Sequence, residues 1–312
     1  MSKKKTIIAL LISAAAVALT ALCLLLPKSG KSNFTVNDTL PDGENKKATV
    51  IILAGQSNAS GSTSDEYLRR NVSAEKYAEY ENGYENVYIN YYASGPNKSD
   101  GFVKCTTRQG KIGGFFGPEL GMAERLTELY PDETFFIIKF AKGGTNLYKQ
   151  WLSPSSKGKT GELYRQFVDY VSASIAYLES KGYDVEIEAM CWMQGEADSI
   201  NVENATSYGE HLSNFINDVR KKFKRYSSDD EITFIDAFIS ANSECWKYHE
   251  LVNDCKKAVA DSSPLNVVID TNKEGLTCKN EPEEEPDIAH YDSTSEIKLG
   301  HLFAEEVAKL LK

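Results

Sequence analysis

The chain has 312 residues, of which 41% are hydrophobic and 26% are charged, a composition from which we expect a globular core. Five of the 35 Lys and Arg residues lie in the first 31 positions, so the remainder holds 30 basic and 45 acidic residues, a net charge of −15. So acidic a body repels a phosphate backbone, which argues against nucleic acid as a partner and is easier to reconcile with a neutral, sugar-like substrate.

The N-terminus has the pattern of an export signal. Lys3, Lys4 and Lys5 precede an uncharged run of 21 residues, Thr6–Leu26, which is long enough to cross a bilayer as a helix. Because no small-residue cleavage site follows, residues 1–26 are predicted to be a signal-anchor helix, with a cleaved signal peptide as the alternative. The lysines should stay inside, which places the rest of the chain outside the cytoplasm, anchored by this segment only or secreted.

The rest of the chain is expected to form a linker and one domain. Residues 27–47 are polar and show no apolar period, so we interpret them as a linker. Residues 48–312 alternate short apolar runs with helical patterns, which predicts a parallel sheet between two helical layers. The predicted strands are Thr49–Ala54, Asn86–Tyr92, Thr134–Ala141, Val185–Met193, Ile232–Ile239 and Asn266–Ile269. The predicted helices are Pro118–Tyr130, Glu162–Lys181, Asn204–Phe223, Glu244–Asp261 and Ser293–Leu311.

Ligands of an open parallel sheet bind at the carboxyl ends of its strands, and the first motif lies at such an end. It is Gly55-Gln56-Ser57-Asn58, which follows the first strand. A serine at a strand-to-helix turn can present its hydroxyl at the sheet edge. Taken alone, Ser57 is as well explained as the N-cap of the next helix.

Two further motifs follow predicted strands. In Ala141–Leu147, the pair Gly143 and Gly144 permits close backbone approach, and a free N–H there can donate to an oxyanion. An ordinary tight turn explains the pair equally well. In Trp192–Asp198, Gln194 can donate through its side-chain amide, while Glu196 and Asp198 can orient loops or bind substrate hydroxyls.

The fourth motif is Asp287-Ile288-Ala289-His290, just before the last predicted helix. The three-residue spacing lets the carboxylate accept the imidazole Nδ1–H and leaves Nε2 free to take a serine proton. Asp292 also lies beside His290 and is a second candidate for this partner. The six cysteines include no C-x-x-C pair, which argues against a zinc site, and Cys191 is expected to be a buried free thiol.

Together, these ordered blocks resemble the SGNH-hydrolase superfamily, and within it the sialate O-acetylesterase branch that includes the carbohydrate esterase family 6 acetyl xylan esterases. That branch has G-Q-S-N or G-E-S-N, then A-x-G-G-T, W-x-Q-G-E and D-x-x-H, in the order found here. The resemblance covers nearly all of residues 48–312. It implies a three-layer α/β/α sandwich of the flavodoxin-like type with a central, mainly parallel sheet.

The resemblance also implies an activity and a set of site residues. A serine esterase would remove O-acetyl groups from a carbohydrate (acetylated xylan, sialic acid or a related glycan) through an acyl-enzyme, with no metal or other cofactor. Its triad would be Ser57, His290 and Asp287. The oxyanion hole would combine the Ser57 N–H, Gly143 or Gly144, and Gln194. The candidate substrate contacts are Gln56, Asn58, Glu196 and Trp151.

Two alternatives stay open. One is a lipase or thioesterase of the same superfamily, which an exposed apolar channel would favour. The other is a non-catalytic, membrane-tethered glycan-binding protein built on an inactive esterase fold, although the intact serine, histidine, aspartate and glutamine argue against it. The sequence does not indicate an oligomeric state.

Overall fold

The computed structural model describes residues 33–227 and 231–311, in which a compact unit begins at Phe34. The predicted signal or anchor segment, residues 1–26, lies outside these residues. Within the described ranges, no helix is long and apolar enough to cross a membrane.

A central eight-stranded sheet runs in the order β10-β9-β8-β1-β7-β3-β4, with β5 also paired to β3. All pairs among its six main strands are parallel, and only β4 and β5 pair antiparallel. The six predicted strands are therefore confirmed as the core of the sheet. The strands are β1 (Lys47–Gly55), β3 (Val87–Ala93), β4 (Asn97–Lys98), β5 (Val103–Lys104), β7 (Phe135–Ala141), β8 (Asp184–Met193), β9 (Thr233–Ala237) and β10 (Asn266–Ile269).

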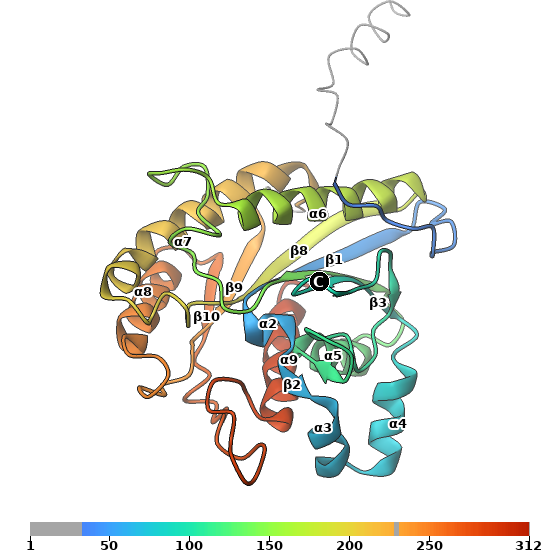
Figure 1. Ribbon diagram of the computed structural model, residues 1–312. Coiled ribbons are helices and arrows are strands. Elements are labelled where there is room, and N and C mark those ends of the chain that lie inside the picture. Colours follow the sequence, from blue (N-terminus) through green and yellow to red (C-terminus); the bar gives the residue numbers. More distant parts are fainter. Residues whose placement is uncertain (1–32, 228–230, 312) are drawn as a thin grey trace, which may run out of the picture. The chain divides into compact units, whose positions relative to one another are not determined.

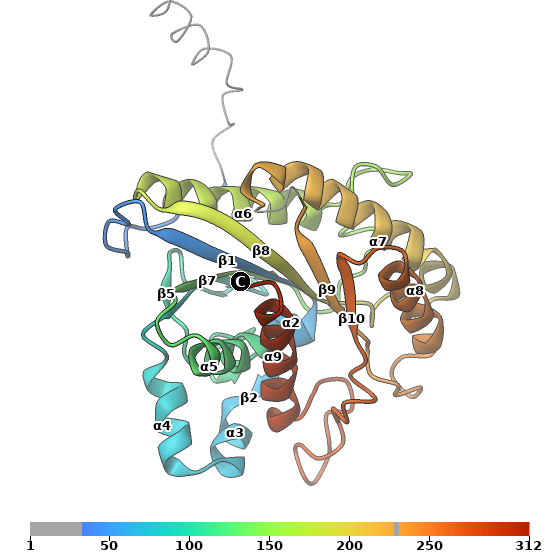
Figure 2. The same ribbon diagram turned by 180° about the vertical axis from the view of Figure 1, so that it is seen from behind.

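Helices cover both faces of this sheet (Figures 1 and 2). On one face lie α6 (Glu162–Ser180) and α7 (Val202–Phe223), with η1 (Lys224–Tyr226) after α7. On the other lie α5 (Pro118–Leu129) and α9 (Ser293–Ala308), and α8 (His249–Asp261) packs beside α7. The three-layer α/β/α sandwich is therefore confirmed.

The helices pack through features that are legible in the sequence. In α6, Leu163, Phe167, Val171 and Ile175 recur at four-residue steps, and all four are buried. Helices α5 and α9 cross closely because a Cβ at Gly121 would overlap the backbone of the facing helix. The same holds for Gly300 in α9, so the glycine pair brings α9, and the loop before it, against the sheet.

The structure differs from the sequence prediction mainly at the N-terminal side. Three short helices were missed: α2 (Ser57–Ser60), α3 (Asp65–Asn71) and α4 (Ala74–Asn82). They have no long apolar period, and the latter two begin at side-chain caps from serines 64 and 73. The small strands β2 (Thr63–Ser64) and β6 (Phe115–Phe116) pair with each other and were also missed.

The predicted linker is shorter than expected. Phe34 packs edge-on against Tyr92 and Tyr170, and Leu40 is buried, so the described part of residues 27–47 lies against the domain. Single apolar residues in a polar stretch have no period to reveal them. The prediction for Cys191 is confirmed, because its thiol is buried and free.

Candidate active site

The first three motifs meet at one edge of the sheet because their strands are neighbours. In the register, Gly55 at the end of β1 lies opposite Ala141 of β7 on one side and Met193 of β8 on the other. The loops that carry Ser57, the glycine pair and Gln194 therefore leave the sheet side by side.

Ser57 is the first residue of α2 and is almost buried. Gly55 has a φ of +145°, and a Cβ there would overlap the carbonyl of Met193, so only glycine permits this turn. The N-cap position belongs to Gln56, and no side-chain cap bond is present. The N-cap explanation of Ser57 is therefore wrong.

The glycine pair lies against the serine. A Cβ at Gly143 would come within 3.4 Å of the Ser57 Cβ. The Gly143 N–H donates to Ser94 Oγ (3.0 Å), whereas Gly144, at φ +68°, has open space around it. In the described part of the chain, no hydrogen-bond partner is found for the Gly144 N–H.

The Asp287–His290 contact expected from the spacing is present. His290 Nδ1 lies 2.7 Å from Asp287 Oδ2, and this hydrogen bond lowers the pKa of Asp287. Asp292 is buried instead and accepts from Asn280 Nδ2 (2.7 Å) and from backbone N–H groups of the loop before it. Asp287, and not Asp292, is therefore the histidine's partner.

A hydrogen bond joins the loop of Ser57 to the loop of His290, through the residues that directly follow these two, Asn58 and Tyr291. Asn58 Oδ1 accepts the N–H of Tyr291 (3.3 Å), while Asn58 Nδ2 donates to Glu196 Oε1 (2.8 Å). No hydrogen bond joins Ser57 Oγ to His290 among the described residues. The bond between Asn58 and Tyr291 is what brings the serine turn and the histidine loop together.

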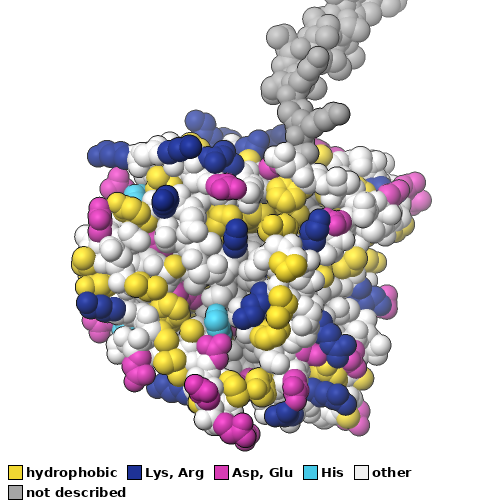
Figure 3. All heavy atoms as spheres, viewed as in Figure 1, with side chains coloured by type: hydrophobic (Ala, Val, Ile, Leu, Met, Phe, Trp, Pro, Cys, Tyr) yellow, Lys and Arg dark blue, Asp and Glu magenta, His cyan; other side chains and the backbone are white. Residues whose placement is uncertain are grey.

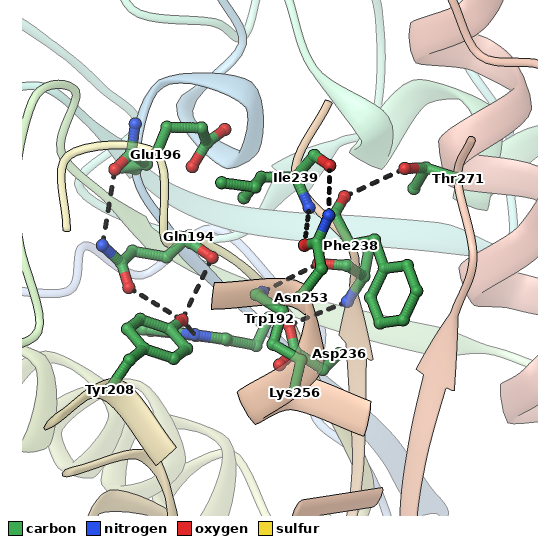
Figure 4. Close-up of polar contacts among 12 residues, drawn as sticks. Trp192, Gln194, Glu196, Tyr208, Asp236, Phe238, Ile239, Asn253, Lys256 and Thr271 are labelled. Atoms are coloured by element: carbon green, nitrogen blue, oxygen red, sulfur yellow. Dashed lines mark hydrogen bonds and ion pairs between the residues drawn. The ribbon is translucent and has the colours of Figure 1, made fainter. Parts of the chain in front are cut away.

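Gln194 does not fit its predicted part in the oxyanion hole. Its Nε2 donates to Thr145 O (2.9 Å) and Asp198 Oδ2 (2.7 Å), and its Oε1 accepts from Tyr208 (3.0 Å). Figure 4 shows its amide turned towards Tyr208 in a buried layer. Both amide hydrogens are therefore committed, and Gln194 holds loops together.

All four predicted substrate contacts are buried, and three of them form their hydrogen bonds with groups other than the Ser57 hydroxyl. Asn58 and Glu196 bond each other, and burial raises the pKa of Glu196. Trp151 is 0% exposed; its Nε1 donates to Thr145 Oγ1 (2.9 Å) and its ring lies 5.1 Å from that of Trp192. Asn58, Glu196 and Trp151 therefore support the site from within, because they are buried and bonded to neighbouring side chains.

Gln56, the fourth predicted contact, lies against the nucleophile. Its Nε2 is 3.4 Å from Ser57 Oγ, and its Oε1 accepts the N–H of Ala197 (3.1 Å). Gln194 Nε2 lies 3.4 Å from the same Oε1. Because the oxygen is held from the third motif, the amide presents its NH₂ to Ser57.

A buried ion pair beneath the third motif was missed. Lys256 Nζ bonds Asp236 Oδ1 and Ala237 O, and both side chains lie within the layer in Figure 4. Gly195, at φ +134°, has no room for a Cβ beside Lys256 and Val252. The sequence carries a signal for this ion pair, because Val252, Lys256 and Val259 share one helix face. A lysine on such an apolar face needs a buried partner.

A cavity of about 350 Å³ lies next to the histidine. Its lining mixes polar and apolar side chains and comes from the loop after α2, the acidic loop of residues 281–286, Phe115, and the histidine with its neighbours. It includes Ser62, Thr63, Ser64, Tyr67, Glu285 and His290. The cavity therefore offers both hydrogen-bonding groups and apolar surface to a ligand.

Comparison with known proteins agrees with this geometry. Residues 47–309 match the family described as carbohydrate esterase, sialic acid-specific acetylesterase. No curated protein matches the chain.

Similar solved structures show the same fold. A protein from Arabidopsis thaliana has a TM-score of 0.61 at 19% identity, over 84% of this chain and 98% of its own. NanS has a TM-score of 0.62 at 16% identity, over 87% and 98%. A carbohydrate acetylesterase from Xanthomonas citri has a TM-score of 0.53 at 14% identity, over 84% of this chain and 56% of its own. Because the family match covers most of the chain, this protein belongs to the carbohydrate esterase, sialic acid-specific acetylesterase family.

Proposed function

We propose that this protein is a serine esterase that removes O-acetyl groups from a glycan through an acyl-enzyme, with Ser57, His290 and Asp287 as its triad. The observation that carries the proposal is the bonded Asp287–His290 pair, on a loop tied through Tyr291 and Asn58 to the turn that bears Ser57. The family is one of carbohydrate esterases, which supports acetate as the acyl group and a sugar as the alcohol.

In the first step, His290 Nε2 takes the Ser57 proton as the hydroxyl oxygen attacks the acetyl carbonyl carbon. The carbonyl oxygen becomes an oxyanion, and His290 then gives the proton to the leaving sugar oxygen as the C–O bond breaks. Asp287 holds the imidazole in the tautomer with its proton on Nδ1. Water, deprotonated by His290, attacks the acetyl-serine and releases acetate.

The oxyanion donors in this proposal are the N–H groups of Ser57 and Gly144 and the amide of Gln56. Ser57 begins α2, so its N–H is one of the four that a helix cannot satisfy internally. Gly144 is preferred to Gly143 because the Gly143 N–H is occupied by Ser94. Gln56 replaces Gln194 because its amide is the one that reaches Ser57.

Acetate release by the full chain tests the proposal. Wild type and Ser57→Ala are compared on acetylated xylan and on O-acetylated sialic acid, with Ser213→Ala on α7 as a matched control. We expect acetate release by wild type and by the control but not by Ser57→Ala. The acetylated substrate that is hydrolysed faster identifies the substrate class. Release by Ser57→Ala at the wild-type rate would rule out Ser57 as nucleophile.

Assays of ester hydrolysis and sugar binding on the same protein distinguish the two alternatives. A lipase or thioesterase would prefer 4-nitrophenyl esters of long acyl chains, whereas an acetylesterase would prefer 4-nitrophenyl acetate. A glycan-binding protein would retain sugar without hydrolysing any ester.

We also propose that the domain works outside the cytoplasm, anchored through residues 1–26 or released after their cleavage. The support is the lysine cluster and the uncharged run that follows it. Cell fractionation with N-terminal sequencing tests this proposal. Recovery of an intact chain from the cytoplasm would contradict it.

A further inference from the structure

A second groove, with a volume of about 740 Å³, lies between the loop before α6 and the first half of α7. No triad residue lines it. Its walls include Tyr148, Leu152 and His211, and the rings of Tyr148 and His211 lie 5.6 Å apart. The His211 Nδ1 atom is buried with no hydrogen-bond partner in the described part of the chain.

Four cations line this groove: Lys149, Lys157, Lys159 and Arg165. All four are exposed, and none forms an ion pair with a described residue. The groove also holds two acids, Glu162 and Glu203, but each accepts a hydrogen bond from a neighbour, Gln166 and Tyr148 respectively. The groove therefore carries a net positive charge on a body whose net charge is −15.

Several other surface cations are paired with carboxylates. Lys47 pairs with two glutamates, Arg108 with Asp65 and Glu81, and Lys181 with two aspartates. Figure 3 shows Lys and Arg side chains gathered along the upper edge of the molecule, over α6 and α7. Four cations against two carboxylates leave the groove positive, and a positive hollow attracts an anionic ligand.

Hydrogen bonds hold the walls of the groove, which begins near the glycine pair Gly143 and Gly144. Asp198 accepts the N–H groups of Leu147 (2.8 Å) and Tyr148 (3.0 Å), while Ser155 bonds Asp218 on α7. Tyr148 is four residues after Gly144, so their Cα atoms lie at most about 14 Å apart. One short oligosaccharide can therefore reach both places.

We propose that this groove binds a carboxylate-bearing sugar of the glycan chain, separate from the sugar whose acetyl group is removed. The lysines and Arg165 would pair with the carboxylate, and the Tyr148 ring would lie along the sugar face. The link to catalysis rests on the proposed esterase function; the binding site itself does not.

Calorimetry with the full chain tests the groove. The ligands are an oligogalacturonate, dextran sulfate of similar length and neutral dextran, each at low and high salt. Lys157→Gln/Lys159→Gln is compared with Lys221→Gln/Lys222→Gln, which removes the same charge from exposed lysines of α7 outside the groove. Tyr148→Ala removes the ring, and thermal melts check that each variant is folded.

We expect oligogalacturonate to bind wild type, with an affinity that falls as salt rises. The affinity should drop roughly 3- to 30-fold in the groove variant and stay unchanged in the α7 control. Tyr148→Ala should also bind more weakly, and neutral dextran should not bind.

Three results would overturn the proposal: no binding of oligogalacturonate, equal loss in the control variant, or binding of dextran sulfate alone. Because binding is measured without turnover, the two proposals can fail separately. Binding in the absence of ester hydrolysis would leave the groove standing and remove the esterase. Hydrolysis without binding would do the reverse.

Discussion

Ser57 and Gln56 belong to a nearly dry layer in which neighbouring side chains are each held by several hydrogen bonds, whereas His290 and Asp287 stand on a partly exposed loop. The side chains of His290 and Asp287 are 22% and 47% exposed, and their mutual bond is the principal one they make. The contrast teaches that the surrounding hydrogen bonds already hold Ser57 and Gln56 in place. The loop of His290 and Asp287 needs a hydrogen bond from another loop to hold it.

That tie runs through Glu196 and Asn58. Glu196 is buried and fixes Asn58, and Asn58 holds the backbone beside His290. The third motif thus reaches the histidine loop indirectly, and it also grips the glycine loop through Gln194 and Asp198. Glu196 and Asp198 therefore hold neighbouring loops together through hydrogen bonds.

The largest expected effect comes from the exposed half. His290→Gln removes the general base and should lower kcat for acetate release by roughly 10⁴- to 10⁶-fold. Because the ring is partly exposed, the melting temperature should change little. Kinetics on the best acetylated substrate and a thermal melt check this, with His249→Gln as control. A loss below tenfold would remove His290 from the mechanism.

The next effect separates the two aspartates of this loop. Asp287→Asn should lower kcat by roughly 10²- to 10⁴-fold, because the amide no longer selects the productive tautomer. Asp292→Asn should instead reduce the free energy of unfolding by about 1–3 kcal/mol, since it disturbs buried hydrogen bonds. Steady-state kinetics and denaturant titrations distinguish them, and exchanged outcomes would make Asp292 the histidine's partner.

Within the dry half, Gln56 and Gln194 can be compared by the same substitution. Gln56→Glu keeps the acceptor for Ala197 and loses the donor at Ser57, so kcat should fall roughly 10²- to 10³-fold at similar KM. Gln194→Glu should mainly lower the melting temperature, because it loses the bonds to Thr145 and Asp198. A pure kcat loss in Gln194→Glu would restore Gln194 as an oxyanion donor.

The smallest effect concerns the tie itself. Glu196→Ala should reduce kcat roughly 10-fold by releasing Asn58 and loosening the histidine loop, with KM little changed. Glu196→Gln keeps an acceptor for Asn58 Nδ2 and should recover most of that loss. Kinetics and hydrogen exchange at Tyr291 check both variants, and equal losses would show that the carboxylate's charge matters and not its hydrogen bond.

The fold could be predicted from the sequence because its signals are local. The buried parallel strands are continuous apolar runs, and α6 shows its apolar face at four-residue steps. The short helices after Ser57 and the packing of Phe34 and Leu40 have no such period. They depend on neighbours far away in the chain, and the prediction missed them.

The sequence by itself indicated that the first three motifs follow strands and that an acid close in sequence pairs with His290, because both depend on residue type and short spacing. Only the tertiary structure decided which polar groups are free. Gln194, Asn58, Glu196 and Trp151 have the right chemistry for a site, but neighbouring loops bury them and take their hydrogen bonds. Gln56 gained its position beside Ser57 because the third motif holds its oxygen. Likewise, charges scattered along 17 positions from Lys149 to Arg165 became one groove only when the loop before α6 folded onto α7.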